Sequence, residues 1–289
     1  MIKTILVPTS GSTTDESVFA TAHTFARTLA AHLEFFHVRL SVAEAAARAP
    51  HVPYCAAAAL PQALAVLQRD EVALAAKAAE HVHKFCAAHE IPLLDTPVVS
   101  ERCTASWKQE TDYPFERLMM RARHSDLIVL GRPRHLDYMP VMLIDDLLMG
   151  SGRPVVIAPD KRARASLETV VVGWKETAES ARALTAAAPL LEKVPKVVLA
   201  HIAEGLDTVP ASLEHLARQL RWHGIAASVQ VVGDVPKHVT SHLAKMVHGM
   251  QADALVVGAF GHTRLREMVF GGITQSLLEH ADIPIFFMH

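Results

Sequence analysis

The two halves of this chain repeat the same order of apolar strands and amphipathic helices, and this repeat constrains the fold more than any other sequence feature. The clearest matching segments are residues 125–131 (SDLIVLG) and 252–258 (ADALVVG), and the apolar segments 153–159 and 283–287 also correspond. Short β-branched runs that alternate with helical segments are typical of parallel strands covered by helices on both faces. We therefore predict an α/β fold with two tandem, doubly wound parallel sheets of five strands each.

The boundary between the two halves is predicted in the short charged segment 159–166. This gives a first domain at residues 1–160 and a second domain at residues 166–289. Both open with a strand, a helix and a second strand, at 5–8, 15–31 and 33–38 in the first and at 169–173, 178–191 and 196–202 in the second. The first half also contains an alanine-rich insertion at 41–60 that leads into a long helix predicted over 61–89, and we expect it to cap or flank that domain.

Composition excludes several classes of function. The 28 basic and 30 acidic residues are balanced and form no Lys/Arg-rich run, so we expect no nucleic-acid partner. No apolar run reaches the roughly 18 residues that span a bilayer, so we expect no membrane insertion. The three cysteines, Cys55, Cys86 and Cys103, show neither metal-site spacing nor an even disulfide set, and the chain enters a strand directly at its start. These features predict a cytoplasmic protein.

A glycine-rich segment is the best candidate for a ligand site. Gly258, Gly261, Gly271 and Gly272 lie with Thr274 between a predicted buried strand at 254–257 and a predicted helix at 275–281. Glycines allow a backbone to approach a phosphate closely, and the N-terminus of a helix favours negative charge. The segment is therefore predicted to hold a nucleotide polyphosphate. The alternative, that these glycines only form a tight turn and close strand-to-helix packing, is equally compatible with the spacing.

At these residues the chain resembles the universal stress protein family, in a tandem form with two family domains in one polypeptide. Gly258, Gly261 and Gly271 match the family pattern of Gly, two residues, Gly, nine residues and Gly, whereas Gly272 stands where Ser or Thr is usual. Thr274 matches a second small hydroxyl residue, and the family often has His at the position of His262. The resemblance implies that the second domain binds ATP or a related adenine nucleotide, with or without magnesium, through Gly258, Gly261, His262, Gly271, Gly272, Thr274 and Lys175.

The sequence departs from the family pattern at two places. Lys175 occupies the position at which an Asp usually contacts adenine, and Ser10 occupies it in the first half. A lysine cannot accept the hydrogen bonds that a carboxylate accepts, although it can pair with a phosphate. In the first half, residues 132–134 (RPR) replace the second glycine, and Gly150-Ser151-Gly152 remains with the wrong spacing. We therefore predict that the first domain is a degenerate copy without a nucleotide site.

No catalytic or metal-binding pattern accompanies the glycine segment. The 18 histidines show no metal spacing, and the sequence contains no nucleophile elbow, Walker lysine loop or dinucleotide fingerprint. Asp234 is interpreted as a helix cap and Asp253 as a residue that precedes a strand, so neither is a candidate base. We expect a nucleotide-binding stress or regulatory module rather than an enzyme, with a non-nucleotide ligand or protein-interaction module and a weak ATPase as alternatives.

The last strand of each half is predicted to lie at a domain interface. In family members these strands pair between two domains, and the chain offers residues 154–158 and 284–288 for such pairing. Apolar edge strands are prone to pairing unless they are covered. We therefore expect the two halves to form an internal pseudo-dimer, and association of two chains into a homodimer is left open.

Overall fold

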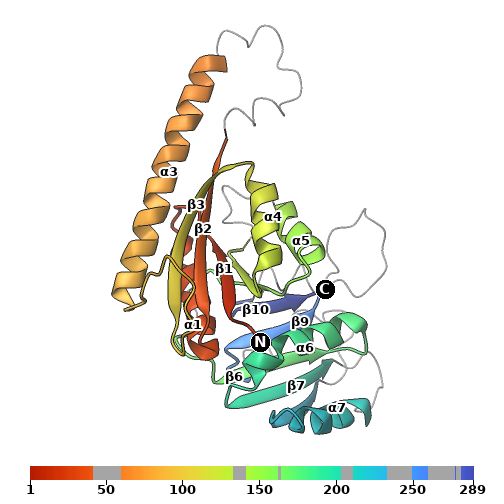
Figure 1. The fold of residues 1–289 in the computed structure, drawn as a ribbon. Helices are drawn as coiled ribbons and strands as arrows, with labels where there is room; N and C mark the ends of the chain where they lie inside the picture. The colour runs from red at the N-terminus through yellow and green to blue at the C-terminus, as the bar shows by residue number, and fades with distance from the viewer. Residues whose placement is uncertain are drawn as a thin grey trace.

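The computed structural model describes residues 1–41, 60–132, 141–161, 164–202, 211–232, 249–259, 277 and 281–289. Their strands form one ten-stranded sheet in the order β3-β2-β1-β4-β5-β10-β9-β6-β7-β8, with helices packed against it (Figure 1). The predicted α/β fold with parallel strands is confirmed. The two predicted five-stranded sheets are joined edge to edge into a single sheet.

The first half contributes the strands on one side of this sheet, all parallel to their neighbours within the half. They are β1 (Thr4–Pro8), β2 (His32–Leu40), β3 (Thr104–Asp112), β4 (Leu127–Leu130) and β5 (Val155–Ile157). The described helices of this half are α1 (Asp15–Leu29), α3 (Leu60–Ala88), α4 (Pro114–His124) and α5 (Val141–Gly150). The long helix predicted over 61–89 is therefore present as α3, and most of the preceding insertion lies outside the described residues.

The second half repeats the arrangement with strands that are also mutually parallel. They are β6 (Thr169–Trp174), β7 (Lys196–Ile202), β8 (Ala227–Val232), β9 (Ala254–Gly258) and β10 (Ile285–Met288), with helices α6 (Ala178–Leu191) and α7 (Ala211–Arg221). The predicted bounds of the helix at 178–191 and of the strand at 196–202 agree with α6 and β7.

The two halves meet where β5 pairs antiparallel with β10, with Val156 opposite Phe286. These are the two last strands that the sequence offered for pairing. Because this central pair is antiparallel while each half is parallel within itself, the strands of the two halves run in opposite directions. The carboxyl ends of β1 and β4 therefore lie at one edge of the sheet, and those of β6 and β9 lie at the opposite edge.

Apolar side chains fill both faces of the sheet, which explains why its central strands read as unbroken hydrophobic runs. One cluster lies on the face covered by α1, α3, α6 and α7, and it includes Phe19, Phe25 and Phe35, each no more than 1% exposed. A second cluster lies on the other face and includes Ile128, Leu255 and residues of α4 and α5. In the described part of the chain, no helix combines the length and apolar character that crossing a membrane requires.

A buried or half-buried aspartate ties the first strand to the fourth strand in each half. The Asp126 carboxylate accepts hydrogen bonds from the backbone N–H groups of Lys3 (2.8 Å) and Thr4 (3.0 Å). The Asp253 carboxylate accepts the equivalent bonds from Glu168 and Thr169, both at 2.8 Å. Asp126 and Asp253 stand second in the two matching segments, and their shared bonding explains why both segments carry an Asp at this position.

Candidate functional site

The candidate site of the second half lies where the strand order reverses. β6 pairs with β7 on one side and with β9 on the other, so the carboxyl ends of β6 and β9 lie side by side. Connections leave these two ends in different directions along the sheet, and ligands of open α/β folds bind in the crevice that this reversal creates. Gly258, the first glycine of the predicted loop, is the last residue of β9.

Gly258 packs directly against the first turn of α6. A Cβ atom at this position would lie 2.6 Å from both the carbonyl carbon of Glu179 and the backbone nitrogen of Ser180. No side chain fits at that distance, so close strand-to-helix packing explains this glycine without any ligand. The same packing brings the N-terminus of α6 to the beginning of the glycine-rich loop.

The turn between β6 and α6 is held by its own hydrogen bonds. The Lys175 N–H donates to the Ser180 hydroxyl (3.3 Å), and the Ser180 N–H donates to the Thr177 hydroxyl, which caps α6 (3.3 Å). Because Ser180 also packs on Gly258, it links the Lys175 turn to the end of β9. Lys175 is exposed. The structure thus brings two predicted site residues, Lys175 and Gly258, to the same edge of the sheet.

Two histidines at this edge were not singled out from the sequence. The His201 Nδ1 atom lies 3.2 Å from the Trp174 carbonyl oxygen, and the His289 Nδ1 atom lies 3.2 Å from the Ala259 carbonyl oxygen. Each contact joins residues about thirty positions apart, so no local spacing reveals it. The useful signal for His201 is the repeat itself, because His37 stands at the equivalent position of β2.

Two glutamates add negative charge near the turn. Hydrogen bonds from Ser212 and Trp174 hold the pKa of Glu176 below its usual value. The pKa of Glu179 is lowered by its own backbone N–H group, with smaller contributions from Thr177, Arg182 and His289. Both carboxylates are therefore ionised at neutral pH. An anionic ligand at this edge needs backbone N–H groups or cations to offset them.

The remaining predicted site residues, Gly261, His262, Gly271, Gly272 and Thr274, lie outside the described residues. Their part in ligand binding stays a prediction. Within the described residues, no three His, Cys, Asp or Glu side chains are grouped as they would be around a metal ion.

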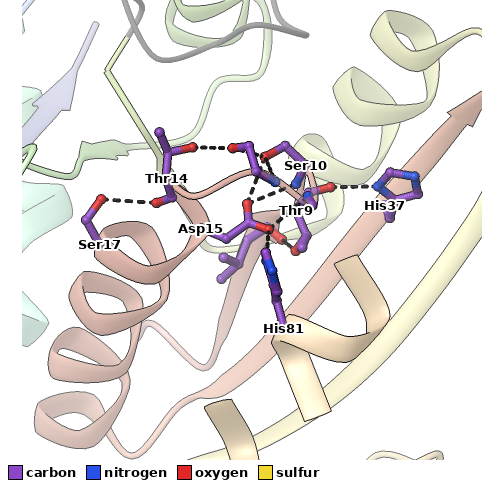
Figure 2. Close-up of polar contacts among 10 residues, drawn as sticks. Thr9, Ser10, Thr14, Asp15, Ser17, His37 and His81 are labelled. Atoms are coloured by element: carbon purple, nitrogen blue, oxygen red, sulfur yellow. Dashed lines mark hydrogen bonds and ion pairs between the residues drawn. The ribbon is translucent and has the colours of Figure 1, made fainter. Parts of the chain in front are cut away.

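The equivalent edge of the first half is filled by the chain's own polar groups (Figure 2). The Asp15 carboxylate, in a residue only 3% exposed, accepts hydrogen bonds from the N–H groups of Ser10 (3.0 Å) and Gly11 (2.9 Å) and from the Ser10 hydroxyl (2.9 Å). The Oδ2 atom that accepts the Gly11 N–H also lies 3.2 Å from the His81 Nδ1 atom of α3. Asp15 lies five positions after Ser10, as Ser180 does after Lys175, so a carboxylate replaces a hydroxyl at the matching place.

Helix α3 closes over this turn. Gly11 has a φ of +78°, and a Cβ atom there would lie 2.5 Å from the Leu74 carbonyl oxygen. His37 repeats the contact of His201, with its Nδ1 atom 2.7 Å from the Thr9 carbonyl oxygen. The close approach of the α3 backbone leaves no room for a ligand on that side of the turn.

The end of β4 in the first half also differs from that of β9. Arg132 is 4% exposed there, and its guanidinium lies 3.5 Å from the Asp160 carboxylate. Gly150 is the last residue of α5, and the Ser151 N–H donates to the Leu147 carbonyl (3.1 Å). The surviving Gly-Ser-Gly segment therefore begins at the carboxyl end of a helix, where unpaired carbonyl groups rather than N–H groups prevail.

Comparison with known proteins connects this fold to one family. The family model for the Universal stress protein family matches residues 166–289. No curated protein sequence matches the chain. A universal stress protein from Archaeoglobus fulgidus DSM 4304 superimposes with a TM-score of 0.69 at 15% identity, covering 99% of this chain and 95% of that chain.

Two solved structures from Pseudomonas aeruginosa show the same likeness. A putative universal stress protein from strain UCBPP-PA14 has a TM-score of 0.56 at 14% identity, covering 99% of this chain and 93% of that chain. A functionally unknown protein from strain PAO1 has a TM-score of 0.55 at 14% identity, covering 99% and 92%. Residues 166–289 thus match the model of the universal stress protein family, and the whole chain shares the fold of these structures. The family resemblance of the first half stays a prediction.

Proposed function

We propose that residues 166–289 bind ATP or a related adenine nucleotide and that the chain is a stress-response or regulatory module rather than an enzyme. The observation that carries the proposal is the pattern Gly258, Gly261 and Gly271, which begins at the end of β9 beside the switch point and the first turn of α6. Packing explains Gly258, so Gly261 and Gly271, which lie outside the described residues, carry the match to the nucleotide pattern. Glycines let the backbone approach a phosphate closely, and the N-terminus of α6 beside Gly258 favours negative charge.

The phosphates supply most of the binding free energy in this proposal. Backbone N–H groups of the glycine loop and the Thr274 hydroxyl donate to phosphate oxygens, and His262 lies within the same loop. Lys175, on the neighbouring turn, adds a positive charge near the two ionised glutamates. Because Lys175 replaces the carboxylate that usually reads adenine, we expect weak discrimination between bases.

The first half serves as a structural partner in this proposal. We infer that residues 1–160 and 166–289 are tandem cytoplasmic domains arranged as an internal pseudo-dimer through the β5–β10 pair. The buried Asp15 carboxylate and the packing of α3 on Gly11 argue against a nucleotide at the first turn. One nucleotide per chain is therefore expected.

Calorimetry with ATP, ADP and AMP, with and without magnesium, tests the proposal. We expect one site per chain, and Gly261→Val should abolish binding because a side chain fills the phosphate approach. Gly249→Val is the matched control, since a Cβ at Gly249 has no atom within 4 Å. Absence of binding at millimolar nucleotide would refute the proposal.

Two further measurements separate the alternatives. Native mass spectrometry of the purified protein would reveal a retained non-nucleotide ligand. A phosphate-release assay that compares the wild type with Gly261→Val tests for hydrolysis, and equal rates would dispose of the ATPase alternative.

A further inference from the structure

Strand β8 forms one end of the sheet, and its outer edge differs from that of β3 at the other end. β8 pairs with β7, and among the described residues no strand pairs with its other side. The outer edge of β3 is partly covered, because the Leu94 N–H donates to the Ala105 carbonyl (2.7 Å) and the Ala105 N–H donates to the Pro92 carbonyl (2.9 Å). β3 also carries the charged residues Lys108, Glu110 and Asp112. Charge and coverage are the usual protections of an edge strand.

β8 has neither charge nor proline. Residues 227–232 read ASVQVV, with Ser228 and Gln230 exposed and Val229 and Val231 half-buried. A neutral strand of this kind presents backbone donors and acceptors that another strand can pair with.

The sequence of β8 is complementary to itself. If two copies lie antiparallel about a two-fold axis at Val229, Ser228 faces Gln230, Ala227 faces Val231 and Val229 faces its own copy. Directly opposed residues of an antiparallel pair share one face of the sheet, so apolar residues meet on one face and polar residues on the other. No charge opposes a like charge, and the net charge of −2 gives little repulsion between chains.

We propose that the outer edge of β8 is a homodimerisation surface, on which two copies of this chain pair β8 with β8 and continue the sheet from one molecule into the other. A two-fold axis requires an isologous, self-complementary contact, and the order apolar-polar-Val-polar-apolar meets that requirement. The chain already contains a contact of the same kind, because β5 and β10 join its two halves by antiparallel pairing. This proposal is independent of nucleotide binding.

A charge-swap experiment tests this surface. Ser228 and Gln230 are exposed, so lysine or glutamate at both positions leaves the core unchanged. The wild type should approach twice the 31.5 kDa chain mass in light scattering at high micromolar concentration. Both S228K/Q230K and S228E/Q230E should weaken the dimer by about tenfold or more, because like charges then face each other in two pairs. A mixture of the two variants should form the heterodimer.

The control places the same charges on the other edge of the sheet. Gln109→Lys with Thr111→Lys alters exposed residues of β3 and should leave the dimer intact. A wild type that keeps the mass of one chain at high concentration would overturn the proposal. So would a dimer that persists in both charged β8 variants, or one that the β3 control disrupts as strongly.

Discussion

Replacement of Gly258 by alanine provides the sharpest test of how the second site is built. The added Cβ would lie 2.6 Å from two backbone atoms of α6, about 1 Å closer than ordinary contact, and neither atom can rotate away. At Gly131, the matching position of the first half, the added Cβ meets only a methyl group of Val18 at 3.3 Å. The two alanine variants therefore differ mainly in whether backbone or a side-chain tip must move.

We expect Gly258→Ala to lower the free energy of unfolding by about 1–3 kcal/mol, the usual cost of overpacking a dense interior. Gly131→Ala should stay within about 0.5 kcal/mol of the wild type. The small cost of shifting the Val18 methyl group is offset because alanine reduces the conformational entropy of the unfolded chain. Urea unfolding of both variants, followed by circular dichroism, measures the difference. Equal destabilisation would refute the argument that α6 packs on β9 more tightly than α1 packs on β4.

Three further predictions follow from buried or paired ionisable groups. Burial and the neighbouring Asp146 raise the pKa of Asp145 to about 6, so its ionisation lowers the stability of the fold as pH rises from about 4 to 6. Solvent screens this partly exposed carboxylate, and Asp145→Asn should therefore stabilise the fold at pH 7 by only about 1 kcal/mol in urea unfolding. Burial raises the pKa of Cys86 to about 11 and of the half-buried Cys103 to about 12, so in a Cys55→Ser background both thiols should react with a disulfide reagent at pH 8 much more slowly than after urea unfolds the chain. Labelling of the native protein as fast as that of the unfolded chain would contradict the raised pKa values. Arg182→Ala should raise the pKa of Glu179 measured by carbon NMR, because the salt bridge of 2.8 Å favours the ionised form, and an unchanged titration would show that the backbone N–H, Thr177 and His289 lower this pKa without Arg182.

The fold could be predicted from the sequence because its signals are local. Residues 178–191 and 196–202 have the length and spacing of a helix and a strand, and the repeat duplicates each signal. The joining of two sheets into one is not a local feature. It depends on the apolar edges of β5 and β10, two strands that are far apart in sequence and adjacent in the fold. The sequence predicts that both strands lie at a domain interface, but their antiparallel register is seen only in the structure.

The candidate site was less predictable because its contacts are not local. Asp15 reads as an ordinary residue at the start of a helix, yet its carboxylate meets His81, 66 positions later. His289 reaches Ala259 only because β10 lies beside β9. Such pairs leave no spacing in the sequence, so they emerge only once the strand order is known.

Divergence of the two halves follows from a few substitutions at equivalent places. Where the first half has Asp15, a buried carboxylate satisfies the turn after β1 and attracts His81 of α3, which closes over the turn. Where the second half has Ser180, a neutral hydroxyl holds the turn through a longer bond, and Gly258 lets α6 reach the end of β9. We therefore expect the two reciprocal substitutions to have different effects. Asp15→Ser removes the anion that anchors α3, whereas Ser180→Asp introduces an anion beside the proposed phosphate loop and should weaken nucleotide binding more than it perturbs the fold.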